Sequence, residues 1–547
     1  MWMAVVLVIA IVAALIFLDV RKPKNFPPGP LWLPVVGSLP SLRAKKPKGK
    51  GTGFLCETLT AMAKHYACPL LGIRVGKDRM VIICNLDTAK EMLTREEFDG
   101  RPTGPFFETR TWGSRKGVMI VDGAFWVEQR RFVLRHLKDF GFGRRTMEEL
   151  VQVEVAEMVK HLMKVIHAPS TKKRIAPKNF PELANGAVKV TVESSKGQSV
   201  YAEGSQTAEA DDQPGAVMWL HDAFGVSVLN TLWSMMAGVR YNPDDAKMRE
   251  LQTLLTQLFA TIDVTGCPFS HFPFLRYCAP NMSGYRQFVE THQSIWEFLY
   301  AELEKHKSTF RSGHCRDFMD AYLEQMEIEK KEGRLDSNYN DAQLVAICMD
   351  LFMAGSETTS KTLGFAFLFL ITHQEVQKKV RAEIDAVIGR DRLPMLSDRP
   401  RLPYTEAVVL ECLRMFVGRS FGLSHRAMRD SWLQGYFIPK DTMLVVCFSN
   451  ILMNQEFWDD PEMFKPERFI DSEGNIQIPD CMIPFGVGKR RCVGESLAKS
   501  NVFLFIAALL QSFEFSLPEG DTAPPLCGQE GLTPSPLPYR AKVTLRR

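Results

Sequence analysis

The feature that most restricts this chain is a glycine-rich, basic segment around one cysteine, residues 484–495 (PFGVGKRRCVGE). A cysteine that binds a metal must be a thiolate near positive charge, on a backbone that lets a large planar cofactor approach. Arg490 supplies the charge, the glycines permit tight turns, and Phe485 can limit the access of water. Cys492 is therefore a candidate metal ligand, although a single cysteine is more often an inert buried residue.

Five positions of this segment form the pattern Phe-x-x-Gly-x-Arg-x-Cys-x-Gly, carried by Phe485, Gly488, Arg490, Cys492 and Gly494. With each residue type at about 5% frequency, a random chain of this length would contain the pattern with a probability of order one in several thousand. The pattern resembles the haem-binding loop of the cytochromes P-450. The resemblance implies haem b as the cofactor, with the Cys492 thiolate as the proximal iron ligand and Phe485 beside the sulfur.

A second motif of that family is similar to residues 411–414 (ECLR). The spacing places Glu411 and Arg414 on one helix face within ion-pair reach, and most such pairs are surface salt bridges of small value. In the family the pair joins an arginine of a Pro-Glu-Arg-Phe stretch, which is Arg468 in this chain. The resemblance implies a buried network of these three side chains that supports the cysteine loop and takes no part in catalysis.

Residues 353–359 (MAGSETT) lie in a long apolar run that starts after a candidate helix cap at Asn340 and ends near Ile371. In an ordinary helix the hydroxyl would bond the carbonyl four residues earlier, and the acid would be solvated. The run resembles the central distal helix of the family. The resemblance implies that Glu357 and Thr358 break the helical hydrogen-bond ladder, that Thr358 holds a water, and that Glu357 delivers protons for the reduction of dioxygen.

Residues 126–130 (WVEQR) resemble the Trp-x-x-x-Arg helix of the family, which implies that Trp126 and Arg130 contact the haem propionates. By motif position, Arg101, His425 and Arg490 are further candidates for propionate contacts.

Three bases on the same predicted helix, Arg131, Arg135 and Lys138, are spaced to share another face. Such a stripe is commonly just solvated. In the family this face docks an acidic flavoprotein reductase that oxidises NADPH. The resemblance therefore implies the same partner here, with cytochrome b5 as a candidate second redox partner. We expect Lys489 and Arg491 to face either the partner protein or solvent.

The N-terminal residues 1–18 carry no charge and would span about 27 Å as a helix, close to the thickness of a thin bilayer core. A cleaved signal peptide is the alternative, but the bases Arg21, Lys22 and Lys24 follow the apolar run instead of preceding it. We therefore expect a single-pass anchor in the endoplasmic reticulum membrane, with the remainder of the chain in the cytosol.

The chain is expected to fold as mainly α with minor β, because helical stretches alternate irregularly with short β-prone ones. The predicted parts are a transmembrane helix over 1–20, a stiff basic and proline-rich hinge over 21–30, and one large catalytic domain of cytochrome P-450 fold over 31–547. Within this domain, the polar residues 191–215 are predicted to be a disordered insertion.

Composition excludes several other classes of protein. The net charge of +4 on 547 residues gives no reason to expect a nucleic-acid partner. The twelve cysteines contain no Cys-x-x-Cys pair, so neither a zinc ribbon nor a disulfide framework is indicated.

Two segments bear on the substrate. Between Arg414 and His425 the chain lacks the prolines usual in the family, so Arg419 and Phe421 are candidates for substrate contacts, with a surface ion pair as the alternative for Arg419. The aromatic residues 267–277 (CPFSHFPFLRY) are either core or a loop that touches the bilayer.

Together the motifs are similar to those of the microsomal family-2 clan, and residues 135–142 (RHLKDFGF) to its insect members. The resemblance implies a membrane-bound monooxygenase, competent as a monomer, that hydroxylates or epoxidises a lipophilic molecule such as a steroid, a terpenoid or a foreign compound. A haem-thiolate isomerase or dehydratase, and a non-catalytic haem- or lipid-binding membrane protein, are the alternatives.

Overall fold

The computed structural model describes residues 2–44, 54–167, 215–262, 266–334 and 336–546. Helices dominate these residues and strands are few, which confirms the predicted mainly α class. The α-helices are α1 (Trp2–Val20), α2 (Leu39–Ala44), α3 (Leu55–Tyr66), α4 (Leu86–Thr94), α5 (Pro105–Thr109), α6 (Gly123–Asp139), α7 (Arg145–Ile166), α8 (Gly225–Ala237), α9 (Ala246–Thr261), α10 (Pro268–His271), α11 (Leu275–Cys278), α12 (Tyr285–Thr309), α13 (Phe318–Lys331), α14 (Asp341–Thr372), α15 (Gln374–Val387), α16 (Pro403–Val417), α17 (Ser449–Leu452) and α18 (Glu495–Ser512).

The strands form three small sheets. They are β1 (Leu70–Val75), β2 (Asp78–Ile83), β3 (Gly215–Trp219), β4 (His425–Arg426), β5 (Ser431–Leu433), β6 (Tyr436–Ile438), β7 (Met443–Val446), β8 (Phe513–Ser516) and β9 (Arg540–Leu545). The largest sheet has the order β1-β2-β7-β4, with β7 parallel to β2 and antiparallel to β4. Because β4 opens with His425, opposite Leu444 of β7, this sheet brings that histidine to the candidate site.

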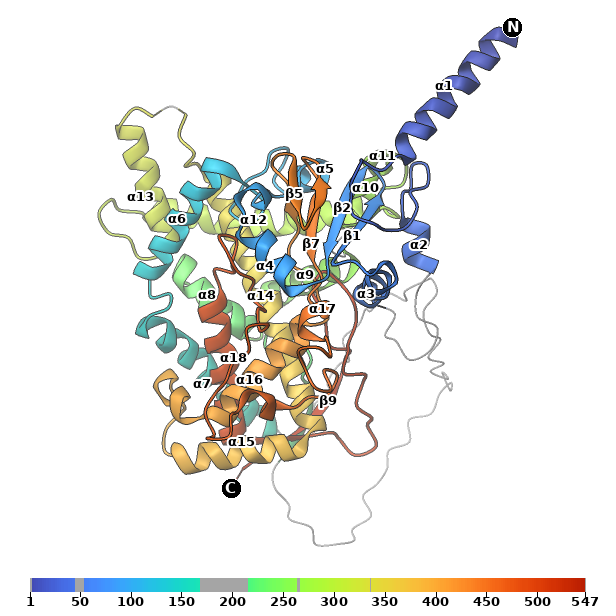
Figure 1. The fold of residues 1–547 in the computed structure, drawn as a ribbon. Helices are drawn as coiled ribbons and strands as arrows, with labels where there is room; N and C mark the ends of the chain where they lie inside the picture. The colour runs from blue at the N-terminus through green and yellow to red at the C-terminus, as the bar shows by residue number, and fades with distance from the viewer. Residues whose placement is uncertain (1, 45–53, 168–214, 263–265, 335, 547) are drawn as a thin grey trace, which may run out of the picture.

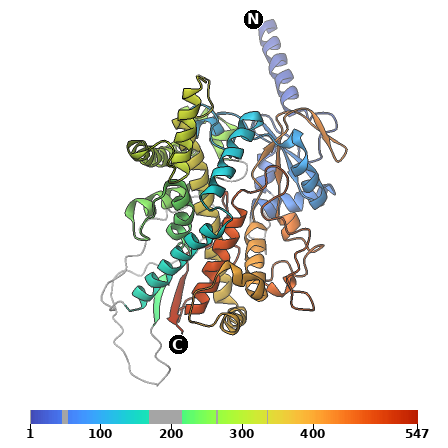
Figure 2. The same cartoon turned by 90° about the vertical axis from the view of Figure 1, so that its left-hand side faces the viewer.

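Helix α14 runs through the middle of the helical body (Figures 1 and 2). It begins where the Asn340 side chain accepts a hydrogen bond from Gln343 N–H, so the predicted cap is confirmed. Apolar residues surround almost the whole helix, and they pack against α8, α12, α16 and α18 in one core. A helix that is apolar on every side is stable only when it is buried in this way.

Helix α1 extends away from the body in both views (Figures 1 and 2). None of the helices that the structure describes is both long and apolar enough to cross a membrane.

The segment predicted as a hinge, 21–30, is non-helical, follows α1 and makes contacts with the catalytic body. Phe26 is buried beside Trp32, Pro28 O accepts a hydrogen bond from Gly72 N–H of β1, and Asn25 O accepts one from Phe437 N–H of β6. Because its apolar ring and its carbonyl groups find partners on the two sheets, the segment folds onto the catalytic body.

The predicted insertion over 191–215 lies outside the described residues except for Gly215, which opens β3.

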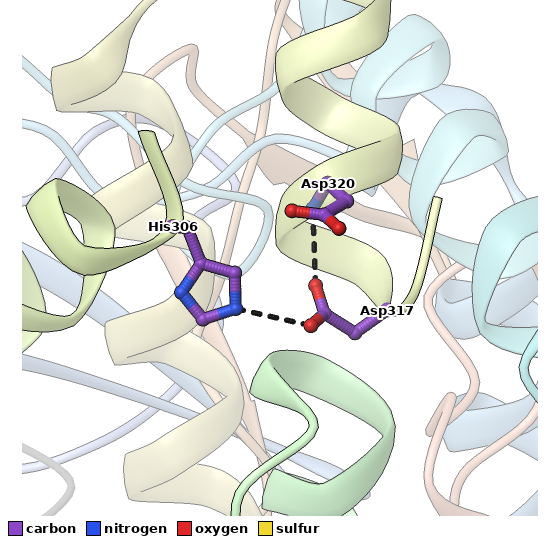
Figure 3. Close-up of side chains that lie close together, drawn as sticks. All are labelled: His306, Asp317 and Asp320. Carbon is purple, nitrogen blue, oxygen red and sulfur yellow. Dashed lines mark hydrogen bonds and ion pairs between the residues drawn. The ribbon is translucent and has the colours of Figure 1, made fainter. Parts of the chain in front are cut away.

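Helices α12 and α13 are joined by a buried polar cluster, in which His306 Nε2 lies 3.0 Å from Asp317 Oδ2 and Asp317 accepts a hydrogen bond from Asp320 N–H at the start of α13 (Figure 3).

Candidate functional site

The cysteine loop lies directly before α18 and is closed by its own backbone. Cys492 N–H donates to Phe485 O at 3.0 Å, and Gly494 N–H donates to the Cys492 sulfur. At Gly488 the backbone has φ +76°, and a Cβ there would lie 1.9 Å from Leu93 O, so only glycine fits between this loop and α4. Burial raises the pKa of the Cys492 thiol, so a nearby cation or metal is required to hold it as a thiolate.

A cavity of about 370 Å³ separates this loop from α14. Cys492 and Phe485 line one side, and Ala354 and Thr358 of α14 line the other. The Cys492 side chain is exposed because it lines this cavity. The cavity therefore has both a thiol from the cysteine loop and residues of α14 in its lining.

The bases named as candidates for propionate contacts are brought together at the cavity. Arg101, Arg130, His425 and Arg490 all line it, together with Trp126. The Arg490 guanidinium stacks on the Trp126 ring at 3.7 Å from its centroid, while its nitrogens donate to two backbone carbonyls.

Burial lowers the pKa of these bases, although Asp99 and Asp122 act in the opposite direction on two of them. Burial and the neighbouring Arg490 lower the pKa of Arg101 to about 9, and burial lowers that of Arg490 to about 10. Burial and the charge of Arg101 lower the pKa of His425 to about 3, so this ring is neutral and its Nδ1–H donates to Phe98 O at 2.8 Å. An anionic group beside these bases would therefore be stabilised.

The two residues expected to relay protons lie on different sides of α14. Thr358 lines the cavity, and its hydroxyl donates to Ala354 O at 2.8 Å. Glu357 does not line the cavity: Thr256 of α9 donates to its Oε1 at 2.9 Å, and Lys361 lies 3.9 Å from its Oε2.

The predicted break in the helical ladder at this point is wrong. Helix α14 continues through both residues without interruption, and Thr358 makes the back-bond to the carbonyl four residues earlier that is ordinary for a hydroxyl inside a helix. Burial raises the pKa of the Glu357 carboxyl group.

The three residues of the predicted supporting network lie together. Arg414 pairs with Glu411 at 2.6 Å with both side chains fully buried, and Arg468 Nε lies 3.1 Å from the other Glu411 oxygen. The network joins α16 to the 3-10 helix η3 (Pro466–Phe469). Its three residues are not among those that line the cavity.

Of the two candidate substrate contacts, only Phe421 lines the cavity. Arg419 instead pairs with Glu462 at 2.7 Å, which is the surface ion pair considered as its alternative. Sequence reasoning missed Asp350, Val118 and Met119, which also line the cavity. An acid inside the apolar run of α14 was the signal that could have drawn attention to Asp350.

Comparison with known proteins decides the family. The sequence profile described as cytochrome P450 matches residues 27–185 and 198–543. The chain belongs to the cytochrome P450 family. The cytochromes P450 are monooxygenases, so the chain is assigned to that enzyme class.

Several cytochromes P450 resemble the chain over nearly its whole length. A protein named probable cytochrome P450 303a1 from Drosophila melanogaster is 39% identical over 541 residues, 98% of both chains. Farnesoate epoxidase from Bombyx mori is 34% identical over 94% of this chain and 93% of its own. Cytochrome P450 2B2 from Rattus norvegicus is 30% identical over 94% and 93%. The predicted similarity to the family-2 clan and to insect members is confirmed.

Cytochromes P450 carry haem, and the cavity of this chain fits that group. Its lining combines the Cys492 thiol, which can bind iron, with Trp126, Arg101, Arg130 and Arg490, whose N–H groups suit two carboxylates. The Trp126 Nε1 and Arg101 Nε atoms are buried without a hydrogen-bond partner among the described residues, which is the state expected of donors whose acceptor belongs to a bound group.

Proposed function

We propose that this chain is a membrane-anchored monooxygenase that uses NADPH, through a flavoprotein reductase, to insert one atom of dioxygen into a lipophilic small molecule. The second oxygen atom leaves as water, with two electrons from NADPH. The observation that supports this most is the cavity, whose lining combines Cys492, a cluster of bases and many apolar side chains. The bound haem would supply the activation of dioxygen.

In this proposal the residues of the chain hold the haem and exclude water. Cys492 would be the iron ligand, with the Gly494 amide hydrogen bond tuning the sulfur. Trp126, Arg130 and Arg101 would donate to the propionates, and Arg490 and His425 would complete that group. Phe485 lines the cavity on the same side as the sulfur and would keep water away from it.

Protons would pass through α14. Thr358 lines the cavity, and Glu357 is a buried carboxyl group one residue away with a raised pKa, so it would readily carry a proton. Replacing Thr358 with valine removes the hydroxyl at nearly constant volume. We expect Thr358→Val to release more hydrogen peroxide per NADPH consumed; unchanged coupling would contradict the relay.

The substrate would be a neutral or weakly polar lipophile, such as a terpenoid, a steroid or a foreign compound. Apolar side chains form much of the cavity lining, including those of Leu351, Phe416 and Phe421. One relative is named for the epoxidation of farnesoate, which supports a terpenoid as the first compound to screen.

Labelling with ¹⁸O₂ tests the reaction. A screen of terpenoids and steroids by the haem spin-state shift would select ligands, and turnover with NADPH and reductase should place one ¹⁸O atom in the product. Product formed without NADPH and without label would indicate an isomerase or dehydratase. Ligand binding with no oxidised product from any compound would indicate a non-catalytic binding protein.

The reductase would dock on the basic face of α6. Arg131, Arg135 and Lys138 are exposed there, and they line one groove together with Arg130 and Lys489, next to the cysteine loop. Opposite charge on a partner would speed association and bring its electron donor close to the sulfur.

Charge reversal tests the docking face. We expect Arg131→Glu with Arg135→Glu to slow reductase-supported turnover at low salt while leaving turnover driven by hydrogen peroxide unchanged. The matched control is Arg145→Glu, an exposed base on α7 outside the groove. Equal effects of the two changes would contradict a specific docking face.

The membrane anchor is supported by exposed apolar side chains. Trp2, Leu7 and Leu18 are exposed on α1, and Leu31 and Tyr277 are exposed on the body. Helices α10 and α11 lie near the base of α1 (Figure 1), so an endoplasmic reticulum membrane that held α1 would meet this part of the body.

Flotation with phospholipid vesicles tests the anchor. The full chain should remain with the vesicles at high salt, and deletion of residues 2–20 should release most of it. Equal flotation of both proteins would contradict the anchoring role of α1.

A further inference from the structure

A buried guanidinium lies in the first strand of the largest sheet. Arg74 is the one charged residue of β1, and its side chain is only 6% exposed, which is unfavourable unless the charge is paired and hydrogen-bonded. Its ionic partner lies in α1. Arg74 Nη1 and Nη2 donate to the two carboxylate oxygens of Asp19 at 3.0 and 2.8 Å, and Nη1 also donates to Asp19 O. Leu33 O accepts a further hydrogen bond from Nη2 at 3.0 Å.

The Asp19 carboxylate depends equally on this pair. Asp19 lies in the last turn of α1, where no base accompanies it, and the partial negative charge at the C-terminus of a helix disfavours an acid. The stabilising charge therefore comes from the catalytic body, 55 residues later in the chain. Without α1, Arg74 would keep Leu33 O as its side-chain acceptor among the described residues, and its charge would be left without an acid.

The same carboxylate holds a strained turn, residues 33–37. Asp19 Oδ2 accepts a hydrogen bond from Val35 N–H at 2.8 Å. Val35 has φ +64°, a conformation that is unfavourable for a β-branched residue and persists only where its surroundings impose it. Directly after the turn, Ser38 N–H donates to Arg74 O at 2.6 Å, and Arg74 N–H donates to Ser38 Oγ at 3.2 Å. Helix α1, turn 33–37 and β1 therefore meet at one point, the anchor junction.

The anchor junction determines how α1 leaves the body. Figure 1 shows the helix departing close to α11, and apolar side chains are exposed on turn 33–37 and on α11, among them Val35 and Tyr277. We infer that Asp19 and Arg74 form an orientation lock, which makes α1 and the body tilt as one rigid unit at a lipid bilayer and turns these apolar side chains toward the lipid. The inference rests on the proposed function for the role of α1 as an anchor.

Asp19→Asn tests the anchor junction on the full-length, haem-loaded chain in detergent. The change removes the charge that accepts from Arg74 and from Val35 N–H, and hydrogen bonds to charged acceptors are strong enough for their loss to shift an opening equilibrium about tenfold or more. We expect amide hydrogen exchange in residues 31–38 to accelerate at least about tenfold. Unchanged exchange would overturn the anchor junction.

The orientation is measured in oriented bilayers of phosphatidylcholine. The haem is held in the body, so the polarised absorption of its Soret band reports the tilt of the body relative to the bilayer. The unmodified chain should give a dichroic ratio distinct from that of random orientation, and Asp19→Asn should move the ratio toward the random value. Faster exchange with an unchanged ratio, or a random ratio for the unmodified chain, would overturn the orientation lock.

Two further variants separate the orientation lock from general damage to the fold. Arg74→Gln breaks the same pair from the side of the body without leaving a buried charge in β1, and it should change both readouts in the same direction. Arg79→Gln is the matched control, because Arg79 lies directly opposite Arg74 on β2 but donates to Lys440 O of the body. Equal changes in Arg79→Gln would overturn the specific role of Arg74.

The two proposals fail in different ways. If the full chain does not float with vesicles, the membrane anchor fails together with the orientation lock, while exchange in detergent still decides whether the anchor junction holds. If the chain floats but Asp19→Asn leaves exchange and the dichroic ratio unchanged, only the orientation lock fails.

Discussion

Replacing Arg414 with methionine should destabilise the fold severely. The side chain is completely buried, and it donates to Glu411 at 2.6 and 2.8 Å, to Leu452 O at 2.7 Å and to Pro461 O at 2.8 Å. Methionine fills similar space without any donor. The Glu411 carboxylate would then keep only the Arg468 side chain and one backbone amide as partners.

The size of the effect follows from this geometry. Removing one partner of a buried ion pair costs about 3–5 kcal/mol, because an uncompensated charge is left in the interior. A solvent-exposed pair of the same spacing contributes only about 0–1 kcal/mol. Lys378 and Glu375 on α15 form such a pair at 3.0 Å, with side chains that are 61% and 80% exposed.

The free energy of unfolding of both variants is measured by urea denaturation of the full chain in detergent, with loss of the haem absorption as the readout. Arg414→Met should lower the free energy of unfolding by about 3–5 kcal/mol, and Lys378→Met by less than about 1 kcal/mol. Changing Glu411 to leucine as well should recover part of the loss, since no buried carboxylate is then left unpaired. Equal stability of the two single variants would refute the reasoning.

Three more predictions concern the site and the body. Cys492→Ser should abolish the red-shifted Soret band of the reduced carbon monoxide complex. Cys481 is a buried thiol outside the cavity, so Cys481→Ser should keep the band. The reverse result would contradict the assignment of the iron ligand. Gly488→Ala should prevent stable haem binding because its methyl group would collide with Leu93 O, and full haem content would contradict this. Burial lowers the pKa of His306, but its hydrogen bond to Asp317 outweighs burial and raises the pKa above its usual value. The pair therefore stabilises the fold fully below about pH 6.5, the pKa of an unfolded histidine. This stabilisation is lost as the pH rises through the folded-state pKa of His306. His306→Phe should remove that fall in the free energy of unfolding, and an unchanged pH profile would contradict the role of the pair.

Several parts of the site followed from the sequence because local spacing determines them. The loop around Cys492, the helix that begins after Asn340 and the pair of Glu411 with Arg414 depend on residues a few positions apart, whose geometry a turn or a helix fixes. These motifs occur along the chain in the same order as in the family, and this resemblance implied that they build one haem cavity.

Other parts could not be predicted, because they depend on which elements pack together. Glu357 was expected beside Thr358 at the reaction centre, yet α9 packs against α14 and supplies Thr256 as its partner. Arg419 was a candidate for contact with substrate, but Glu462, 43 residues later, lies within reach and pairs with it. Asp350 was missed because its partners lie more than 230 residues earlier in the chain.

The sequence by itself determined the family, the reaction class and the cysteine proposed to bind the haem iron, since residue types at short, fixed spacings carry that chemistry. Only the tertiary structure decided which side chains face the cavity. A helix presents each residue to one direction, and the neighbouring elements decide whether that direction is a cavity, a partner or the core. For this reason Thr358 and Asp350 line the cavity while Glu357, on the same helix, does not.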